Sequence, residues 1–213
     1  RFLYYIGWNP GVNISYHLAI GLAISENNSS FQKVFPGPIL DRSKNENFFN
    51  TAPFVICDES GWKMWYVSCT GWSIINNHPE PYYNIKIAVS DDGINWKRTG
   101  QVAIENDSFA EAIGKPFVYR EENCYKMIYS YRNASGYRND PTKSYRLGYA
   151  ESNDGFLWER KDKEIGIGLS KDGWDSVMME YASSYIHHGI RYLLYNGNGF
   201  GESGFGYAVL GNE

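Results

Sequence analysis

Two stretches of this sequence occur twice at the same spacing, and that duplication constrains the fold more than any other feature. Lys63–Tyr66 returns as Lys126–Tyr129, and Ser90–Trp96 returns as Ser152–Trp158 around a shared Asp-Gly pair, in each case 62 or 63 residues later. Two landmarks displaced by one interval indicate a repeated structural unit. A unit of this length, rich in aromatic and β-branched residues, is typical of a four-stranded propeller blade.

The same succession of strands is predicted in each unit. The anchor strands begin at Arg1, Lys63, Lys126 and Arg191. Three of the anchor strands are preceded by another strand, to which a short polar turn connects them. A third strand and then a short outer strand follow the anchor strand. Helix-period stripes are absent. The sequence therefore predicts an all-β fold, a five-bladed propeller of four-stranded antiparallel blades forming one domain. The predicted units are 1–45, 46–108, 109–172 and 173–213.

The Asp-Gly turn could be read as a metal or ligand loop, but its position favours a structural role. Asp-Gly suits a tight turn that needs positive φ. One copy occurs in each of two units, at Asp92 and Asp154, and each is followed by a Trp. We interpret the turn as scaffold and expect its Trp to pack between blades.

Composition excludes several classes of partner. A net charge of −4 without a Lys/Arg-rich block argues against nucleic acid, and no stretch approaches a membrane span. Cys57, Cys69 and Cys124 are an odd number without metal spacing, so we expect core or incidental thiols in a reducing compartment, which favours the cytoplasm. Neither a cofactor nor a metal set is indicated.

The start of the chain carries a further expectation. Arg1 opens directly in strand-like sequence, without an initiator Met. We expect part of the first blade and one further blade to be missing at this end, because five blades need roughly 100 residues more than the 213 of this chain.

Strand direction predicts where a site lies. The starts of the innermost strands and the loops 8–17, 69–83, 132–144 and 196–203 gather at one mouth of the channel, whereas the Asp-Gly turns fall at the other. Propeller ligands bind where inner-strand ends converge. At this mouth Glu180 is the leading candidate for a catalytic acid, with Glu111 from the neighbouring unit as the second. Asp175 is either a third carboxylate or a turn cap.

Amide, guanidinium and aromatic side chains at the same mouth suit sugar recognition, since amides chelate hydroxyl groups and rings stack on sugar faces. The predicted substrate-binding residues are Trp8, Asn9, Thr51, Trp72, Lys115, Arg132, Tyr181, Asn196 and Asn198. Lys115 and Arg132 suit an anionic sugar such as a uronate or a sugar phosphate, or pair with Glu111. His17 and His78 are loop residues that suit ligand contact, whereas His187 and His188 belong to a turn at the opposite end.

Four motifs carry a family resemblance: Tyr4–Gly11, Gly37–Arg42, Met64–Ser68 and Tyr195–Gly201. The pattern resembles the five-bladed propeller superfamily of arabinanases, levansucrases and invertases, which includes glycoside hydrolase families 32, 43, 62 and 68. It is similar above all to an uncharacterised bacterial glycosyl-hydrolase-like group linked to surface-polysaccharide gene clusters. The resemblance implies a sugar-related fold and an oligosaccharide or polysaccharide ligand.

The superfamily uses a base or nucleophile Asp, a supporting Asp and an acid Glu from three successive blades. The strand-start position that matches the second Asp holds Thr51 without a carboxylate, and the next holds Gly114, with Glu111 three residues earlier. Glu180 occupies this position one unit further on. Two functions remain open: a glycosidase or transglycosidase acting on a bacterial glycan, or a glycan-binding or polysaccharide-assembly module that has lost the carboxylate set. The oligomeric state is not indicated.

Overall fold

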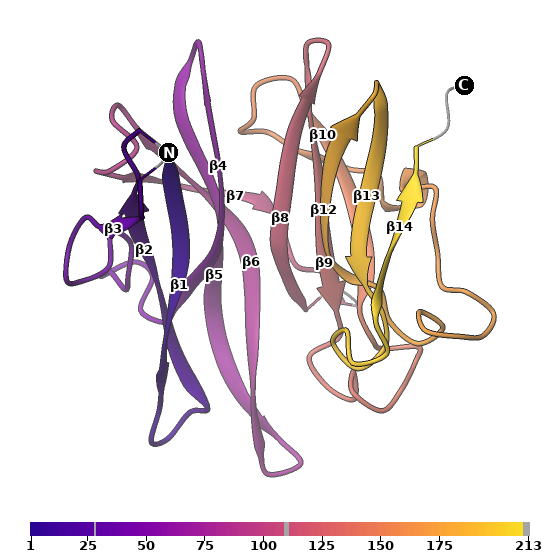
Figure 1. Ribbon diagram of the computed structural model, residues 1–213. Helices are drawn as coiled ribbons and strands as arrows, with labels where there is room; N and C mark the ends of the chain where they lie inside the picture. Colours follow the sequence, from indigo (N-terminus) through magenta and orange to yellow (C-terminus); the bar gives the residue numbers. More distant parts are fainter. Residues whose placement is uncertain (28, 109–110, 211–213) are drawn as a thin grey trace. The chain divides into compact units, whose positions relative to one another are not determined.

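The computed structural model describes residues 1–27, 29–108 and 111–210, and it is built almost wholly of antiparallel β-strands. It divides into two compact units, Arg1–Glu105 and Asn106–Glu213 (Figure 1). A single 3-10 turn, η1 (Asp162–Glu164), and no α-helix occur in the described ranges. No helix there has the length and apolar character to cross a membrane. The predicted all-β class is confirmed.

Unit 1 contains two successions of paired strands. The strands of the first are β1 (Phe2–Pro10), β2 (Tyr16–Ile24) and β3 (Gln32–Lys33). The strands of the second are β4 (Asn50–Asp58), β5 (Gly61–Ile75), β6 (His78–Ser90) and β7 (Lys97–Ile104). Each strand pairs antiparallel with the next in its succession. A core cluster that includes Ile20, Leu40, Met64 and Tyr66 joins the two.

Unit 2 repeats this plan. The strands of its first succession are β8 (Ala112–Glu121), β9 (Cys124–Arg132), β10 (Arg146–Ser152) and β11 (Glu159–Arg160). The strands of its second are β12 (Glu180–His187), β13 (Ile190–Asn196) and β14 (Phe205–Val209). Pairing is again antiparallel and sequential. Its core cluster includes Ile128, Leu147, Met179 and Tyr195.

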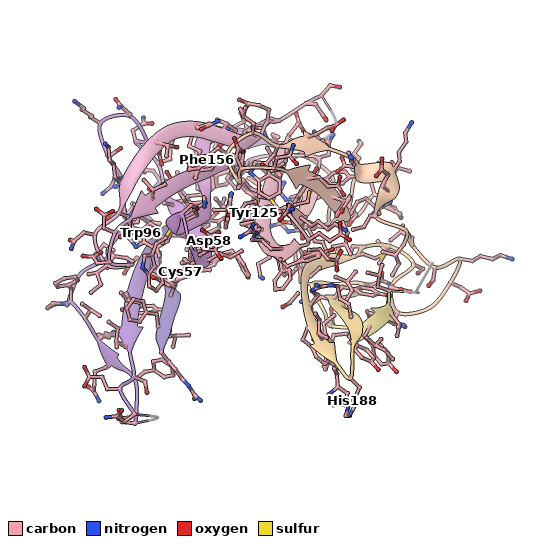
Figure 2. All side chains as sticks on the ribbon, turned by 90° about the horizontal axis from the view of Figure 1, so that it is seen from above. Cys57, Asp58, Trp96, Tyr125, Phe156 and His188 are labelled. Atoms are coloured by element: carbon pink, nitrogen blue, oxygen red, sulfur yellow. The ribbon has the colours of Figure 1, made fainter. Side chains whose placement is uncertain are left out.

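The Asp-Gly turns have the structural role expected of them. Gly93 has φ 72°, Ser90 Oγ accepts its N–H at 2.9 Å, and Trp96 Nε1 donates to its carbonyl at 3.1 Å. The second copy, Ser152–Trp158, repeats both bonds at 2.9 and 3.0 Å. Trp96 packs against the core cluster between β1–β3 and β4–β7 (Figure 2). The turn residues thus form hydrogen bonds with one another, and Trp96 anchors the first turn by packing against the core.

The hairpins at the opposite end from the predicted site are two-residue turns, as the sequence indicates. Asp58 pairs with Gly61, Glu121 with Cys124, and His187 with Ile190. Figure 2 shows His188 at the tip of the β12–β13 hairpin, and His187 and His188 are both exposed. All three cysteines are free: Cys57 is exposed, Cys69 buried and Cys124 partly buried.

One expectation about loops was wrong. Residues 69–83 form the extended β5–β6 hairpin, which closes with Ile75 opposite His78. Asn76 and Asn77 take φ 51° and 63°, the left-handed pair that a two-residue hairpin turn requires and that Asn tolerates. Trp8, Asn9 and His17 likewise belong to β1 and β2 rather than to a loop.

Candidate functional site

The inner strands of three repeats begin with the same distorted backbone. Ala52, Lys115 and Tyr181 have φ 43°, 53° and 56°, and a register shift follows Thr51, Gly114 and Glu180 in β4, β8 and β12. Left-handed backbone at a non-glycine residue costs about 1 kcal/mol or more and is frequent at functional sites. The recurrence confirms that Thr51, Gly114 and Glu180 occupy one repeat position.

Glu180 is the most unusual of these residues. It is 0% exposed, and neither carboxyl oxygen has a hydrogen-bond partner. Burial raises the pKa of Glu180 from 4.5 to about 8, and the positive charge of Arg132 opposes the rise only in part. Glu180 therefore carries its proton at neutral pH, and it is a buried acid that no described group holds by a hydrogen bond.

Arg132, at the end of β9, is fixed by its surroundings. It is 2% exposed, and its guanidinium lies 3.8 Å from the ring centre of Tyr137 and 5.6 Å from that of Tyr145. Its Nε donates to Tyr145 Oη at 3.0 Å and Nη1 donates to the Asn133 carbonyl at 2.9 Å. This cation is held by aromatic faces and neutral oxygens and adds positive potential around Glu180.

An aromatic cluster covers this part of unit 2. Tyr145 lies 5.7 Å from Tyr181 and 6.0 Å from Phe200, and Tyr137 lies 6.4 Å from Phe200, measured between ring centres. Tyr137 and Tyr145 are buried, whereas Tyr181 and Phe200 are 40% and 42% exposed. Exposed rings backed by buried ones suit stacking on a sugar face. The sequence prediction did not select Tyr145. Phe200 belongs to the loop 196–203 that the sequence placed at this mouth, and its φ is 61°.

The other predicted carboxylates of unit 2 have partners. Glu111 Oε2 accepts the Ala134 N–H at 2.6 Å, and the Glu111 N–H donates to the Arg132 carbonyl at 3.0 Å. Glu111 is partly buried. Asp175 is 3% exposed, and its Oδ2 accepts from Tyr195 Oη at 2.9 Å while Oδ1 has no partner. Glu111 is thus hydrogen-bonded to the backbone on both sides of Asn133, at Arg132 and at Ala134. Asp175 is hydrogen-bonded to Tyr195 of β13.

The two asparagines differ. Asn196 lies opposite Glu180 in the β12–β13 pairing and is partly buried. Asn198 Oδ1 accepts the N–H groups of Val177 and Met178 at 2.7 and 3.1 Å, and its Nδ2 donates to the Gly173 carbonyl at 3.0 Å. Asn198 thus holds the loop that precedes β12, and its predicted contact with a ligand stays a prediction.

Two of the predicted residues of unit 1, Trp8 and Trp72, belong to an aromatic group within that unit. Trp8, 65% exposed, lies 4.7 Å from Tyr16, and Tyr16 lies 5.3 Å from Trp72. Buried polar atoms without partners occur here too: Thr51 Oγ1, Trp72 Nε1 and Asn84 Oδ1. Asn9 is exposed at the end of β1. His17 Nε2 lies 3.0 Å from Asp41, and His78 Nδ1 lies 3.2 Å from Glu80.

Most of the unsatisfied polar atoms share a location. Within each unit considered separately, Thr51, Asn84, Glu180, Asp175 and Ser144 lie near the starts of inner strands or the ends of their neighbours. At the opposite end of unit 2, Glu121 pairs with Lys126 at 2.6 Å and with Arg191 at 3.3 Å, although Arg191 Nε has no hydrogen-bond partner among the described residues. Buried polar groups normally have partners, so these atoms are candidates for contact with a ligand or water.

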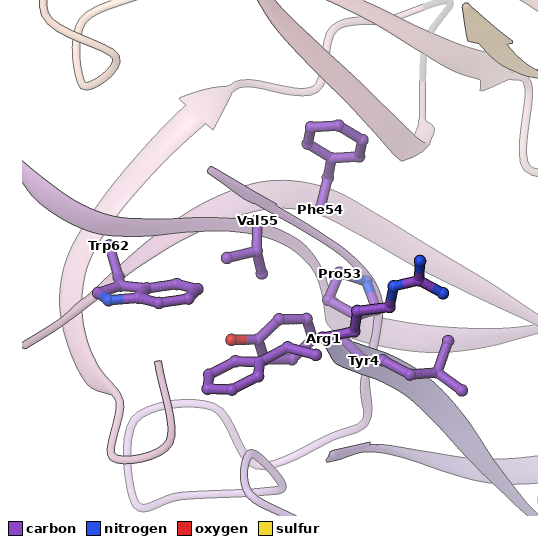
Figure 3. Close-up of a pocket in the computed structure, with 8 residues that line it drawn as sticks. Arg1, Tyr4, Pro53, Phe54, Val55 and Trp62 are labelled. Atoms are coloured by element: carbon purple, nitrogen blue, oxygen red, sulfur yellow. The ribbon is translucent and has the colours of Figure 1, made fainter. Parts of the chain in front are cut away.

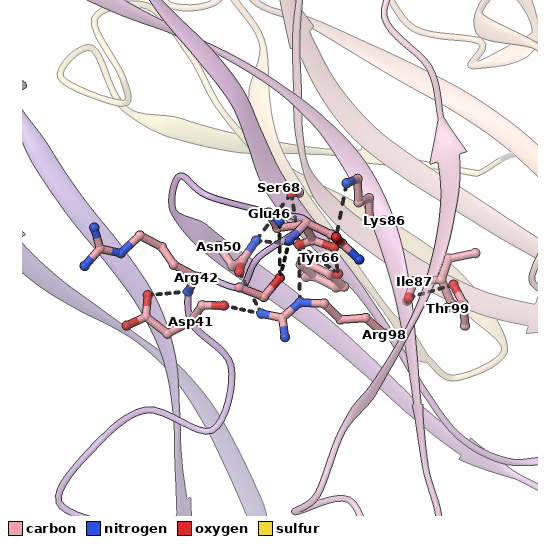
Figure 4. A network of polar contacts seen from close by, with 12 residues as sticks. Asp41, Arg42, Glu46, Asn50, Tyr66, Ser68, Lys86, Ile87, Arg98 and Thr99 are labelled. Carbon is pink, nitrogen blue, oxygen red and sulfur yellow. Dashed lines mark hydrogen bonds and ion pairs between the residues drawn. The ribbon is translucent and has the colours of Figure 1, made fainter.

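A second buried carboxylate shows how Glu180 differs. The sequence prediction missed Glu46, which lies outside the repeated strands. It accepts hydrogen bonds from Asn50 at 2.9 Å, Tyr66 at 3.0 Å and Ser68 at 3.1 Å (Figure 4). Arg98 Nε and Lys86 Nζ lie 3.4 and 3.7 Å from its oxygens. Glu46 has the partners of a structural carboxylate.

A groove in unit 1 carries no acid. It runs along the start of β1 and the middle of β4 and is lined by Arg1, Phe2, Leu3, Tyr4, Pro53, Phe54, Val55 and Trp62 (Figure 3). Its apolar floor and single cation offer no acid–base pair. Across the described part of the chain, no group of three His, Cys, Asp or Glu side chains gathers as a metal site.

Comparison with known proteins gives both relatives and structural neighbours. The Mycobacterium tuberculosis (strain H37Rv) protein described as "Uncharacterized protein Rv1502" is 37% identical over 213 residues, which are 100% of this chain and 68% of that protein. A solved "Glycoside hydrolase" has a TM-score of 0.70 at 19% identity over 98% of this chain and 61% of its own. A thermostable family-43 glycoside hydrolase has a TM-score of 0.70 at 21% identity, with 93% and 65% covered. No family model matches the chain.

This chain therefore spans less than two thirds of the length of either hydrolase. Both hydrolases are β-propellers, so the likeness shows a fold of the propeller class. The numbers of blades and of strands in each blade stay predictions.

Proposed function

The chain belongs to the family of the mycobacterial protein Rv1502, and we propose that it is a carbohydrate-active protein of the glycoside hydrolase or transglycosidase class. Its substrate would be a bacterial oligosaccharide or polysaccharide, bound at the strand-start end of unit 2. The complete fold would be a single five-bladed propeller of four-stranded blades, acting in the cytoplasm. The propeller fold shared with glycoside hydrolases supports this class.

The state of Glu180 carries the proposal. Cleavage of a glycosidic bond requires one carboxylic acid that is protonated at working pH to donate a proton to the leaving oxygen. A carboxyl in an apolar pocket acquires this property through its raised pKa. Glu180 is buried, without a hydrogen-bond partner and with a pKa of about 8. Its activity as an acid would fall as the pH rises through about 8, because the proton is then lost.

A second carboxylate is needed as base or nucleophile. Glu111 is the better candidate in unit 2, because it is partly exposed and its backbone N–H bonds to the carbonyl of Arg132, the cation beside Glu180. Asp175 is buried and bonded to Tyr195. Tyr181 and Phe200 would stack on the sugar and Asn196 would bind its hydroxyl groups. Glu180 is fully covered, so substrate binding would require movement of a covering side chain.

Leaving-group dependence tests the role of Glu180 after a screen of synthetic glycosides has identified a substrate. Glu180→Gln should lower kcat/KM by about 10²–10⁴ on an alkyl glycoside, whose leaving group needs the proton. The same variant should lose far less on the dinitrophenyl glycoside of the same sugar, whose leaving group departs unaided. Glu164→Gln, an exposed position in η1, is the matched control and should behave as wild type.

Two outcomes would contradict the proposal. Equal losses on both glycosides would show that Glu180 does not act as the proton donor. Glycan binding by the wild type without turnover of any glycoside would leave the other function, a glycan-binding or assembly module on the same fold.

A further inference from the structure

Lys115 is a cation without a partner at the proposed site. It lies in β8 at the left-handed position that follows Gly114, and it is partly buried. In the described ranges no carboxylate lies within ion-pair distance of its ammonium group, although Glu111 is only four residues away. Burial lowers the pKa of Lys115, and no neighbouring carboxylate offsets the effect.

Most described basic side chains of unit 2 do have partners. Lys126 pairs with Glu121 at 2.6 Å, Lys161 with Glu151 at 2.7 Å, and Arg160 with Asp162 at 2.6 Å. A fully buried lysine is normally paired, because removal of its charge from water is costly. Lys115 is partly buried and has no described partner, so its ammonium group is free to bind the charge of a ligand.

The fold links Lys115 to the start of the strand that carries Glu180. Gly114 pairs with Ser130 across β8 and β9, and Ser130 Oγ accepts the Tyr181 N–H at 2.8 Å. Lys115 therefore occupies in β8 the position that Tyr181 occupies in β12, and Ser130 connects the two strand starts. A charge carried on Lys115 lies at the same end of unit 2 as the buried acid.

We propose that the substrate carries an anionic group, a carboxylate or a phosphate or sulfate ester on a sugar unit, and that Lys115 binds it beside the scissile bond. Lys115 and Arg132 place two basic side chains at this end of unit 2, where Glu111 is the acidic residue nearest to Lys115 in sequence. An ammonium group bound to a carboxylate or phosphate forms a charge-assisted hydrogen bond, among the stronger polar contacts in proteins. This inference rests on the proposed function and names its substrate class.

Calorimetric titration with matched oligosaccharides tests it. The first pair of probes is a trigalacturonate and its neutral methyl ester. The second set is a neutral trisaccharide with its 6-phosphate and its 6-sulfate. Wild type should bind at least one anionic probe about 10- to 100-fold more tightly than its neutral counterpart. Lys115→Met should abolish that preference, so that anionic and neutral probes bind with similar affinity, and Lys115→Arg should retain most of it. Lys163→Met, which removes an exposed lysine in η1, should match wild type.

The outcomes separate the two proposals. Preference for the uronate or for an ester identifies the source of the charge. Binding of neutral probes alone, or an anionic preference that survives Lys115→Met, overturns the inference and leaves the proposed function standing. Absence of binding to every probe contradicts both. Thermal unfolding of each variant shows whether a lost preference reflects lost folding.

Discussion

At the scale of the residue, two buried glutamates have opposite environments. Glu46 is surrounded by donors from Asn50, Tyr66 and Ser68, and Arg98 lies 3.4 Å away. No described residue donates a hydrogen bond to Glu180, and burial raises its pKa to about 8, which favours the protonated form. The first arrangement favours a stable charge and the second a transferable proton. Glu180 could be found from sequence because it fills a repeat position. Glu46 could not, because it lies in the connection between β3 and β4, where nothing repeats.

The Glu46 network predicts a large stability effect. Glu46→Ala should lower the free energy of unfolding by about 3–5 kcal/mol, because it leaves the partly buried Arg98 without its counter-charge and the buried Tyr66 hydroxyl without its acceptor. The Tyr66 pKa is raised by burial and then by Glu46, and Glu46→Ala should lower it. Chemical denaturation measures the first effect. Glu26→Ala, at an exposed position of the same unit, should change stability by less than about 0.5 kcal/mol, and equal effects of the two substitutions would show that the network is unimportant.

At the scale of the element, the repeated features are scaffold and the differences carry function. The Asp-Gly turns and the left-handed strand starts recur with nearly the same φ values, whereas Thr51, Gly114 and Glu180 differ in chemistry. Sequence periodicity predicted the repeated parts well, because period-2 patterns and turn residues are local signals. It did not predict the length of the β5–β6 hairpin, because residues 69–83 contain prolines and mixed polarity that resemble a loop.

Two glycines of unit 1 give a matched test of the turn. Both require left-handed backbone, with φ 72° at Gly93 and 77° at Gly100. A Cβ at Gly93 would lie 2.9 Å from the Phe2 ring and 3.0 Å from Trp62, whereas a Cβ at Gly100 would meet nothing within 4 Å. Gly100→Ala should therefore cost about 1 kcal/mol of stability and Gly93→Ala about 2–4 kcal/mol. Thermal unfolding compares them, and a Gly100→Ala loss as large as that of Gly93→Ala would show that packing at the turn contributes nothing.

At the scale of the whole molecule, the chain combines a propeller-type β fold with strand starts that differ in chemistry. Structural neighbours of this chain are glycoside hydrolases, and the strand-start position holds Thr51, Gly114 and Glu180 in three successive repeats. The fold class could be predicted from one sequence because the repeat of 62 or 63 residues indicates a repeated β-sheet unit. The site could be predicted only in part, since burial, missing partners and the aromatic cover of Arg132 arise from packing between segments far apart in the chain.

Titration of the Glu180 carboxyl is the measurement that tests this account most directly. Carbon-13 labelling of glutamate side chains, with Glu180→Gln to assign the resonance, follows its protonation between pH 4 and 10. The pKa should be about 8, so the carboxyl should be protonated at pH 7 and lose its proton as the pH rises further. A value near the ordinary 4.5 would mean that Glu180 is charged at pH 7, and it would contradict the assignment of Glu180 as the acid.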